Sequence, residues 1–309
     1  MIKRAGELLF KKIMTRIHHE KESGPREYAV GPYTIMLPVG HRLDSYQKTY
    51  KRYDIALGEI ANIIAQKYPN MTALDIGANI GDSAALICKY QKIPVLCIEG
   101  DKHFIPLLRE NSARIGAHII IEECFIGADT QYIDEKTIDN HHGTASLVNA
   151  AFSLQNHHAI AMKSLSIVLD EHPSFLASKL LKIDTDGYDF FIIINSLETI
   201  QALKPIIFFE YDPSFKPNGY EESLRAIECL FDLGYKKFII YDNFGNFLRV
   251  IEDQDIEQFV DLNAYLRSNM QFKKIVYYFD ICAFHNDDQD LFYELRRKER
   301  INVKIKVSV

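Results

Sequence analysis

The feature that most constrains this chain is a glycine-rich turn between an apolar strand and the start of a helix. A second apolar strand follows, and it ends in a carboxylate. The first run is residues 74–82 (LDIGANIGD) and the second is residues 97–101 (CIEGD). Glycines let the backbone approach a ligand closely. A carboxylate after the neighbouring strand can accept hydrogen bonds from both ribose hydroxyls. Together the two runs predict a site for a nucleoside cofactor.

Details of the turn favour S-adenosylmethionine (SAM) over a dinucleotide. A dinucleotide turn has the pattern G-x-G-x-x-G, but Asn79 and Asp82 stand at its second and third glycine positions. Asp82 would repel a pyrophosphate, whereas SAM carries an ammonium and a cationic sulfonium besides its carboxylate. We expect Asp75 near that ammonium and Glu99 on the ribose diol. The other predicted cofactor contacts are Gly77, Ala78, Asn79 and Gly81 of the turn, Gly100 after the second strand, and Phe125 and Ile126 beside the adenine.

Composition describes an ordinary globular protein. Its 309 residues, 47% hydrophobic and 25% charged, suffice for one elaborated domain or two small ones. The net charge of −6 argues against a surface built mainly for nucleic acid. Five cysteines without a C-x-x-C pair indicate buried thiols in a reducing compartment. No apolar run reaches the roughly 18 residues of a membrane span, so we expect a cytoplasmic protein.

The chain divides into a helical and hairpin extension over residues 1–70, a cofactor-binding domain over 71–285 and a tail over 286–309. Within the domain, apolar strands alternate with segments of helical period. This alternation predicts an α/β fold with a parallel sheet, right-handed crossovers and helices on both faces. Predicted strands are 72–76, 94–98, 118–121, 179–184 and 205–210, and predicted helices are 82–91, 102–115, 188–202 and 219–233.

Patterns nearer the ends of the chain define further elements. Residues 1–20 predict an amphipathic helix that docks on the domain or a partner subunit, or else lies on a membrane surface. A substrate lid is expected over 128–165, a segment without clear structure. The other expected elements are a hairpin over 27–40, a helix over 54–67, a hairpin over 238–251, a strand over 274–284, and a strand over 301–309 at a sheet edge or on another subunit.

Three segments of the chain resemble the FkbM family of SAM-dependent methyltransferases. They are residues 75–82 (DIGANIGD), residues 181–189 (LKIDTDGYD), similar to the family's K-I-D-x-E-G-x-E run, and residues 205–210 (PIIFFE), similar to its fifth strand ending in glutamate. Residues 143–147 match a recurrent lid segment more weakly. Two positions depart from the family pattern: Asp186 replaces the usual glutamate, and Gly100 stands where many members have proline.

The resemblance implies a class I SAM-methyltransferase fold, which is Rossmann-like. Its sheet is mostly parallel, with seven strands in the order 3-2-1-4-5-7-6, one of them antiparallel. The resemblance also implies O-methyl transfer to a small-molecule or glycan acceptor, commonly to a hydroxyl of a sugar or natural-product precursor. Two alternatives stay open: an NAD-dependent oxidoreductase on a similar sheet, and a non-catalytic scaffold in glycan assembly. A homo-oligomer is also left open.

Charged residues at the ends of the fourth and fifth predicted strands are the candidates for acceptor chemistry. Methyl transfer needs an aligned acceptor oxygen, exclusion of water and a base for the alcohol proton. Lys182 and Asp184 share one face of their strand, and we expect Asp184 to contact the methionine end of SAM or the acceptor. Glu210 is the first candidate for the base. A divalent metal between Asp184 and Glu210 is conceivable but not favoured, so no metal ligand is assigned.

Overall fold

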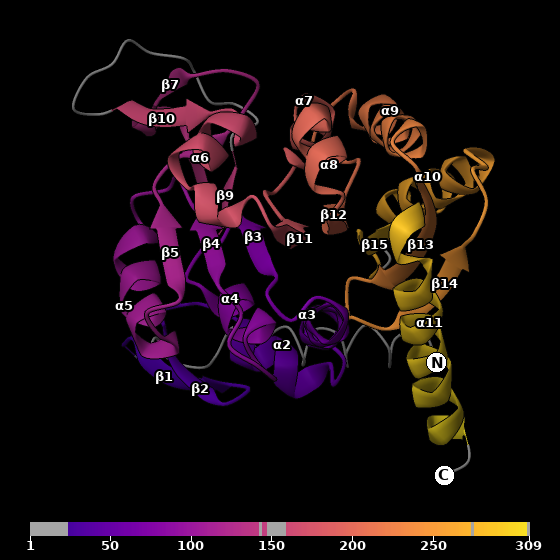
Figure 1. The fold of residues 1–309 in the computed structure, drawn as a ribbon, viewed down its shortest axis with the longest axis horizontal. Helices are drawn as coiled ribbons and strands as arrows, with labels where there is room; N and C mark the ends of the chain where they lie inside the picture. The colour runs from indigo at the N-terminus through magenta and orange to yellow at the C-terminus, as the bar shows by residue number, and fades with distance from the viewer. Residues whose placement is uncertain (1–23, 142–143, 147–158, 273–274, 308–309) are drawn as a thin grey trace.

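The computed structural model describes residues 24–141, 144–146, 159–272 and 275–307, and its centre is an eight-stranded sheet (Figure 1). The strand order across the sheet is β14-β13-β15-β12-β11-β3-β4-β5. The strands are β3 (Thr72–Ile76), β4 (Val95–Ile98), β5 (Ile119–Glu122), β11 (Ser178–Ile183), β12 (Ile206–Tyr211), β13 (Tyr235–Asp242), β14 (Phe247–Ile251) and β15 (Phe279–His285).

The five strands from β5 to β12 run parallel. β15 is antiparallel to both of its neighbours, and β14 is antiparallel to β13. The predicted α/β fold with a mostly parallel sheet is therefore confirmed. The count of seven strands is wrong for this chain, because β14, the second arm of the predicted hairpin, joins the sheet as an eighth strand at its edge.

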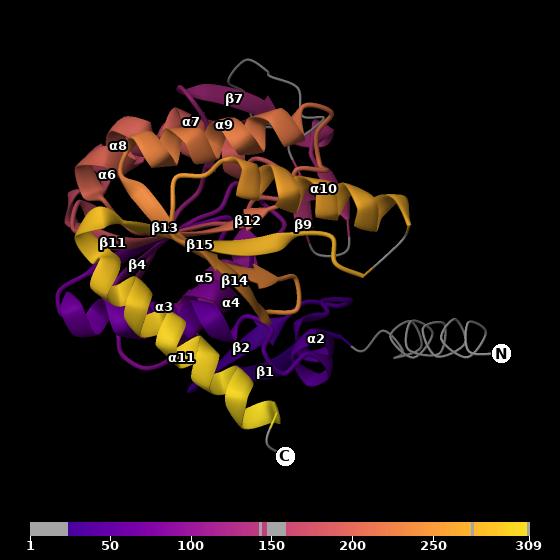
Figure 2. The same ribbon diagram turned by 90° about the vertical axis from the view of Figure 1, so that its right-hand side faces the viewer.

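Helices cover both faces of the sheet, and each face has its own apolar core (Figures 1 and 2). One layer contains α3 (Ile55–Lys67), α4 (Asp82–Ile87), α5 (Ile105–Ile115) and α11 (Gln289–Val307). The other contains α6 (Leu165–Glu171), α7 (Asp189–Asn195), α8 (Leu197–Leu203), α9 (Gly219–Asp232) and α10 (Glu257–Gln271). The helix predicted over 188–202 is divided at Ser196, which lies between α7 and α8.

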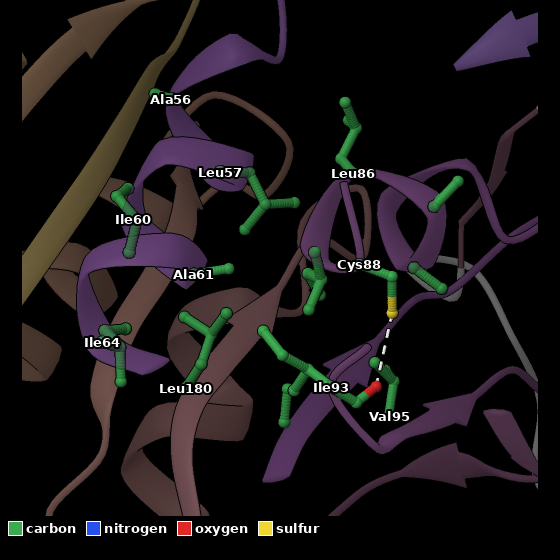
Figure 3. Packing of buried hydrophobic residues seen from close by; sticks show 14 of the residues in the cluster. Ala56, Leu57, Ile60, Ala61, Ile64, Leu86, Cys88, Ile93, Val95 and Leu180 are labelled. Carbon is green, nitrogen blue, oxygen red and sulfur yellow. Dashed lines mark hydrogen bonds between the residues drawn. The ribbon is translucent and has the colours of Figure 1, made fainter. Parts of the chain in front are cut away.

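The described part of the N-terminal extension packs into the first of these cores. The predicted hairpin is present as β1 (Arg26–Val30) and β2 (Tyr33–Leu37), followed by α2 (Leu43–Thr49) and α3. In Figure 3, Leu57 and Ala61 of α3 point toward α4. The helix expected over residues 1–20 lies outside the described residues.

The strand predicted over 301–309 is wrong as far as the structure describes it, because α11 is helical through residue 307. Three apolar residues in its first turns, Leu291, Phe292 and Leu295, are buried against the sheet. Packing of an amphipathic face stabilises a helix, and a formed helix extends cooperatively. The packed first turns therefore outweigh the alternating pattern at the end of the chain.

The expected lid segment contains more regular structure than its sequence indicated in the parts that the structure describes, residues 128–141, 144–146 and 159–165. A small sheet joins β6 (Phe125–Ile126), β10 (Ala159–Lys163) and β7 (Gln131–Asp134) in the order β6-β10-β7. A further pair links β8 (Asp139–His141) and β9 (Thr144–Ser146).

Short 3-10 helices lie at Glu135–Thr137, Pro173–Phe175 and Asn286–Asp288. None of the helices in the described part of the chain has both the length and the apolar character that crossing a membrane requires.

Candidate functional site

Two cavities lie at the carboxyl ends of the parallel strands. The first lies beside the ends of β3 and β4. The second, which is larger, extends from the ends of β11, β12 and β15 to α2 and the start of α3. The two cavities share four of their lining residues, namely Gly77, Asn79, Asp184 and Asp186. Ligands of open α/β sheets bind at such strand ends, so we treat the two cavities as one composite site.

Gly77 is fixed by a close contact between two strand ends. Its φ is +75°, and a Cβ at this position would lie 1.9 Å from the carbonyl oxygen of Asp184. Only a residue without a side chain fits there without a backbone shift. The glycine that the sequence assigned to cofactor approach therefore also lets the end of β3 pack against the end of β11.

Glu99 ties the end of β4 to the glycine turn. Its Oε2 accepts a hydrogen bond from the backbone NH of Asn79 at 2.9 Å, and its Oε1 accepts one from Asp101 at 2.7 Å. Burial raises the pKa of Glu99 to about 7. A carboxylate has about four acceptor sites, so two remain for ligand hydroxyls. Glu99 lines the first cavity, and its contact with a ribose diol stays a prediction.

The predicted adenine contacts lie on the wall of the first cavity. Phe125 and Ile126 line it together with Ile98. Gly100 makes room for Phe125, because a Cβ on Gly100 would lie 2.5 Å from the Phe125 ring. The cavity thus has apolar walls near Phe125 and a carboxylate at Glu99, as a nucleoside requires.

Not every residue of the predicted turn reaches a cavity. Ala78 and Gly81 line neither of them, and Gly81 instead precedes α4 with a φ of +86°. Asp75 lines neither cavity and is fully buried. It accepts a hydrogen bond from the Ser83 hydroxyl at 2.5 Å and forms an ion pair with Lys182 at 3.2 Å. Asp75 is therefore a buried ion-pair partner that positions Lys182. It does not lie on the cavity wall, where we expected it.

Lys182 is a buried cation at the junction of β3 and β11. Its Nζ donates to the carbonyl oxygen of Gly77 at 2.9 Å and lies 3.5 Å from Oδ2 of Asp184. Burial alone would lower the pKa of Lys182, but Asp75 and Asp184 outweigh it and raise the pKa above its usual value. Lys182 is therefore charged, and it links the glycine turn to the strand that carries Asp184.

Acidic side chains follow β11 toward the junction of the cavities. The Asp184 side chain is 53% exposed and lines both cavities. Burial, together with Asp184 and Asp189, raises the pKa of Asp186 to about 8. Asp189 begins α7 and accepts a hydrogen bond from the Thr185 hydroxyl at 3.1 Å, and burial raises its pKa to about 7.

Glu210 lies at the end of β12 and lines the second cavity. Its side chain is buried, and within the described part of the chain its Oε2 has no hydrogen-bond partner. Burial, reinforced by Asp184, Asp189 and Asp186, raises the pKa of Glu210 well above its usual value. Once it is ionised, a buried carboxylate with a raised pKa and an unused oxygen is a stronger base toward a ligand hydroxyl than an ordinary carboxylate.

Sequence reasoning missed several residues of the second cavity. Asp280 is the direct cross-strand partner of Glu210, and Asp54 and Asp82 line the same cavity. A signal for Asp280 was available, because it is a lone carboxylate within the apolar run 275–284. Among the described residues, no group of three or more His, Cys, Asp or Glu side chains is arranged to hold a metal ion.

The sheet topology and the cavities at its strand ends define the class: an α/β protein with a mostly parallel sheet and a candidate ligand site at the carboxyl ends of its parallel strands. Comparison with known families then makes the assignment. The family model for the methyltransferase FkbM domain matches residues 75–237, more than half of the chain. The chain belongs to the FkbM methyltransferase family.

Solved structures give distant likenesses. The methyltransferase FkbM from Methylobacillus flagellatus KT is 18% identical with a TM-score of 0.38, and the alignment covers 55% of this chain and 40% of that one. Precorrin-6y C5,15-methyltransferase from Geobacter metallireducens GS-15 is 12% identical with a TM-score of 0.34, covering 70% and 80%. The plantazolicin methyltransferase BamL is 11% identical with a TM-score of 0.37, covering 79% and 89%. A search of the curated proteins found no match.

Proposed function

We propose that this protein is a SAM-dependent O-methyltransferase. One observation carries the proposal: the first cavity, which has the features of a nucleoside site, shares Gly77, Asn79, Asp184 and Asp186 with a larger cavity that is lined by Glu210. A nucleoside cofactor in the first cavity would have its sulfur end at this junction. An acceptor in the second cavity would then lie between that end and a carboxylate.

The residues present fit SAM. Glu99 would hold the ribose hydroxyls, Phe125 and Ile126 would flank the adenine, and Asp184 or Asp186 would meet the ammonium at the junction. When bound, SAM supplies a methyl group made electrophilic by a cationic sulfur. The protein's own contribution is alignment of the acceptor and exclusion of water.

Glu210 is our proposed base. Its raised pKa makes its ionised form a stronger base than an ordinary carboxylate, and its unused Oε2 can receive the hydroxyl proton. Lys182 positions the site, because it joins Asp75, the Gly77 carbonyl and Asp184.

We further propose that the acceptor hydroxyl belongs to a sugar of a glycan or natural-product precursor. The family resemblance is the main support. The second cavity gives further support, because its lining includes tyrosine rings and carboxyl groups. Tyrosine rings (Tyr46, Tyr53, Tyr278) suit the apolar faces of a sugar, and carboxyl groups suit its hydroxyls. All five cysteines are unpaired, which favours the reducing cytoplasm as the site of the reaction.

Calorimetry with SAM, S-adenosylhomocysteine and NAD tests the proposal. We expect both sulfur nucleosides to bind, NAD not to bind, and Glu99→Ala to weaken SAM binding by at least about tenfold, which corresponds to about 1.4 kcal/mol. Glu123→Ala, which removes an exposed glutamate outside both cavities, is the matched control. Preference for NAD would support the oxidoreductase alternative. SAM binding without labelled-methyl transfer to any sugar acceptor tested would support the scaffold alternative.

A further inference from the structure

Carboxylic acids dominate the wall of the second cavity. Six of the described residues that line it are acidic, namely Asp54, Asp82, Asp184, Asp186, Glu210 and Asp280. The basic side chains on the same wall are Arg42, Lys182 and His41. Lys182 is already paired with Asp75, and burial lowers the pKa of His41. The wall therefore offers an acceptor with a phosphate or carboxylate few cationic partners, whereas it offers a cationic acceptor several carboxyl groups.

Glu210 provides a second, independent indication of a ligand. Its side chain is only 8% exposed, it lines the cavity, and the described residues offer its Oε2 no hydrogen-bond donor. Buried polar atoms are nearly always paired, so an unpaired oxygen on a residue that lines a cavity indicates a hydrogen-bond donor supplied by a ligand. The donor that fits here is the hydroxyl group of the acceptor.

Asp280 lies directly opposite Glu210 across the antiparallel pair β12 and β15. Side chains of such a pair share one face of the sheet, with Cβ atoms about 4.5–5.5 Å apart. Two carboxyl groups therefore face neighbouring positions of one ligand. Burial and acidic neighbours raise the pKa of both carboxyl groups well above the usual range, which favours their protonated forms in the absence of a ligand. A neutral hydroxyl supplies only a hydrogen bond, whereas a bound cation also stabilises the ionised carboxylates.

We propose that the acceptor carries a protonated amine next to its reactive hydroxyl, as in an amino sugar with a free amine. This inference rests on the proposed function and specifies the substrate class of the same site. Glu210 receives the hydroxyl. Asp280 holds the ammonium, with Asp54 contributing from the start of α3.

Binding of four related monosaccharides to the full chain, saturated with S-adenosylhomocysteine, tests this inference. The probes are glucosamine, N-acetylglucosamine, glucose and glucose 6-phosphate, measured by calorimetry at about pH 7, where an amine is largely protonated. We expect glucosamine to bind at least about tenfold more tightly than N-acetylglucosamine or glucose, and glucose 6-phosphate to bind most weakly. Equal binding of the amine and its acetylated form, tighter binding of the phosphate, or no binding of any probe would overturn the proposal.

Substitutions at Asp280 and Asp54 test whether these two residues cause the preference for the amine. Asp280→Asn and Asp54→Asn should each reduce the preference for glucosamine to less than about threefold while leaving the affinity for S-adenosylhomocysteine unchanged. Asp287→Asn is the matched control, because it removes an exposed carboxylate outside the cavity and should keep the preference. If S-adenosylhomocysteine itself does not bind, the proposed function fails. If it binds but the amine preference is absent, only the present inference fails.

Discussion

Replacing Gly77 by alanine tests the close contact on which the composite site is built. The added Cβ would lie 1.9 Å from the carbonyl oxygen of Asp184 and 3.2 Å from Cγ2 of Thr185. The nearest atom belongs to the backbone, so a change of side-chain rotamer cannot relieve the overlap. Gly40 offers a matched control, because its φ is also positive, at +80°, but a Cβ there would meet no atom within 4 Å.

Both substitutions place alanine in the left-handed region of backbone conformation, but only Gly77→Ala also creates a steric overlap with the backbone. Alanine in the left-handed region costs about 1–2 kcal/mol, and the loss of unfolded-state freedom offsets about 0.4–1 kcal/mol of that. Gly40→Ala should therefore lower the free energy of unfolding by about 1 kcal/mol. Gly77→Ala adds an overlap with fixed backbone, for which overpacking costs of about 1–3 kcal/mol apply. We expect a difference of about 2 kcal/mol between the two variants.

Urea denaturation of wild type and both variants measures this difference. Because Gly77 lines both cavities, Gly77→Ala should also weaken SAM binding, whereas Gly40→Ala should not. If Gly77→Ala is no less stable than Gly40→Ala and binds SAM as wild type does, the contact between β3 and β11 does not shape the site.

Three further predictions follow from the buried charges. Asp75→Asn should lower the free energy of unfolding by about 3 kcal/mol, because it leaves the charge of Lys182 without its buried partner; an unchanged urea midpoint would contradict this role. Glu210→Gln should reduce kcat far more than SAM affinity, and wild-type kcat should rise with pH above the usual carboxylate range as Glu210 ionises; a variant with wild-type kcat would remove Glu210 as the base. Burial raises the pKa of Glu99 from its usual 4.5 to about 7, so the native state holds this proton more tightly than the unfolded state. The contribution of protonated Glu99 to the free energy of unfolding is complete below about pH 4.5 and is lost as pH rises to about 7. Wild type should therefore lose more stability over this interval than Glu99→Gln. Equal pH profiles of the two proteins would show that Glu99 does not cause this loss.

Local signals in the sequence predicted several residues that line the first cavity. The glycine turn, the strand before it and Glu99 lie within a short stretch of chain, and their spacing reflects one β-α-β unit. Phe125 and Ile126 were placed correctly on the cavity wall for the same reason, since the next strand of a parallel sheet ends at the same edge.

Residues whose environment depends on strand register were harder to predict. Asp75 and Lys182 are cross-strand partners in β3 and β11, and this pairing turns Asp75 from a cavity residue into a buried counter-ion. Asp280 faces Glu210 only because β15 inserts antiparallel between β12 and β13. Neither register can be read from local periodicity, because it depends on contacts between residues distant in sequence.

The error in the C-terminal tail has a related cause. An alternating pattern indicates a strand when nothing else constrains the segment. Here the preceding residues form a helix that is held by apolar packing and by the ion pair between Glu299 and Arg52, with oxygen and nitrogen 2.6 Å apart. Tertiary contacts outweighed the local pattern.

A crystal structure of the complex with S-adenosylhomocysteine tests the central claim most directly. We predict that the adenosine lies in the first cavity, with the ribose hydroxyls on Glu99 and the sulfur at the junction beside Asp184, facing the cavity that contains Glu210. A nucleoside bound elsewhere, or a first cavity without bound nucleoside at saturating ligand, would contradict the account.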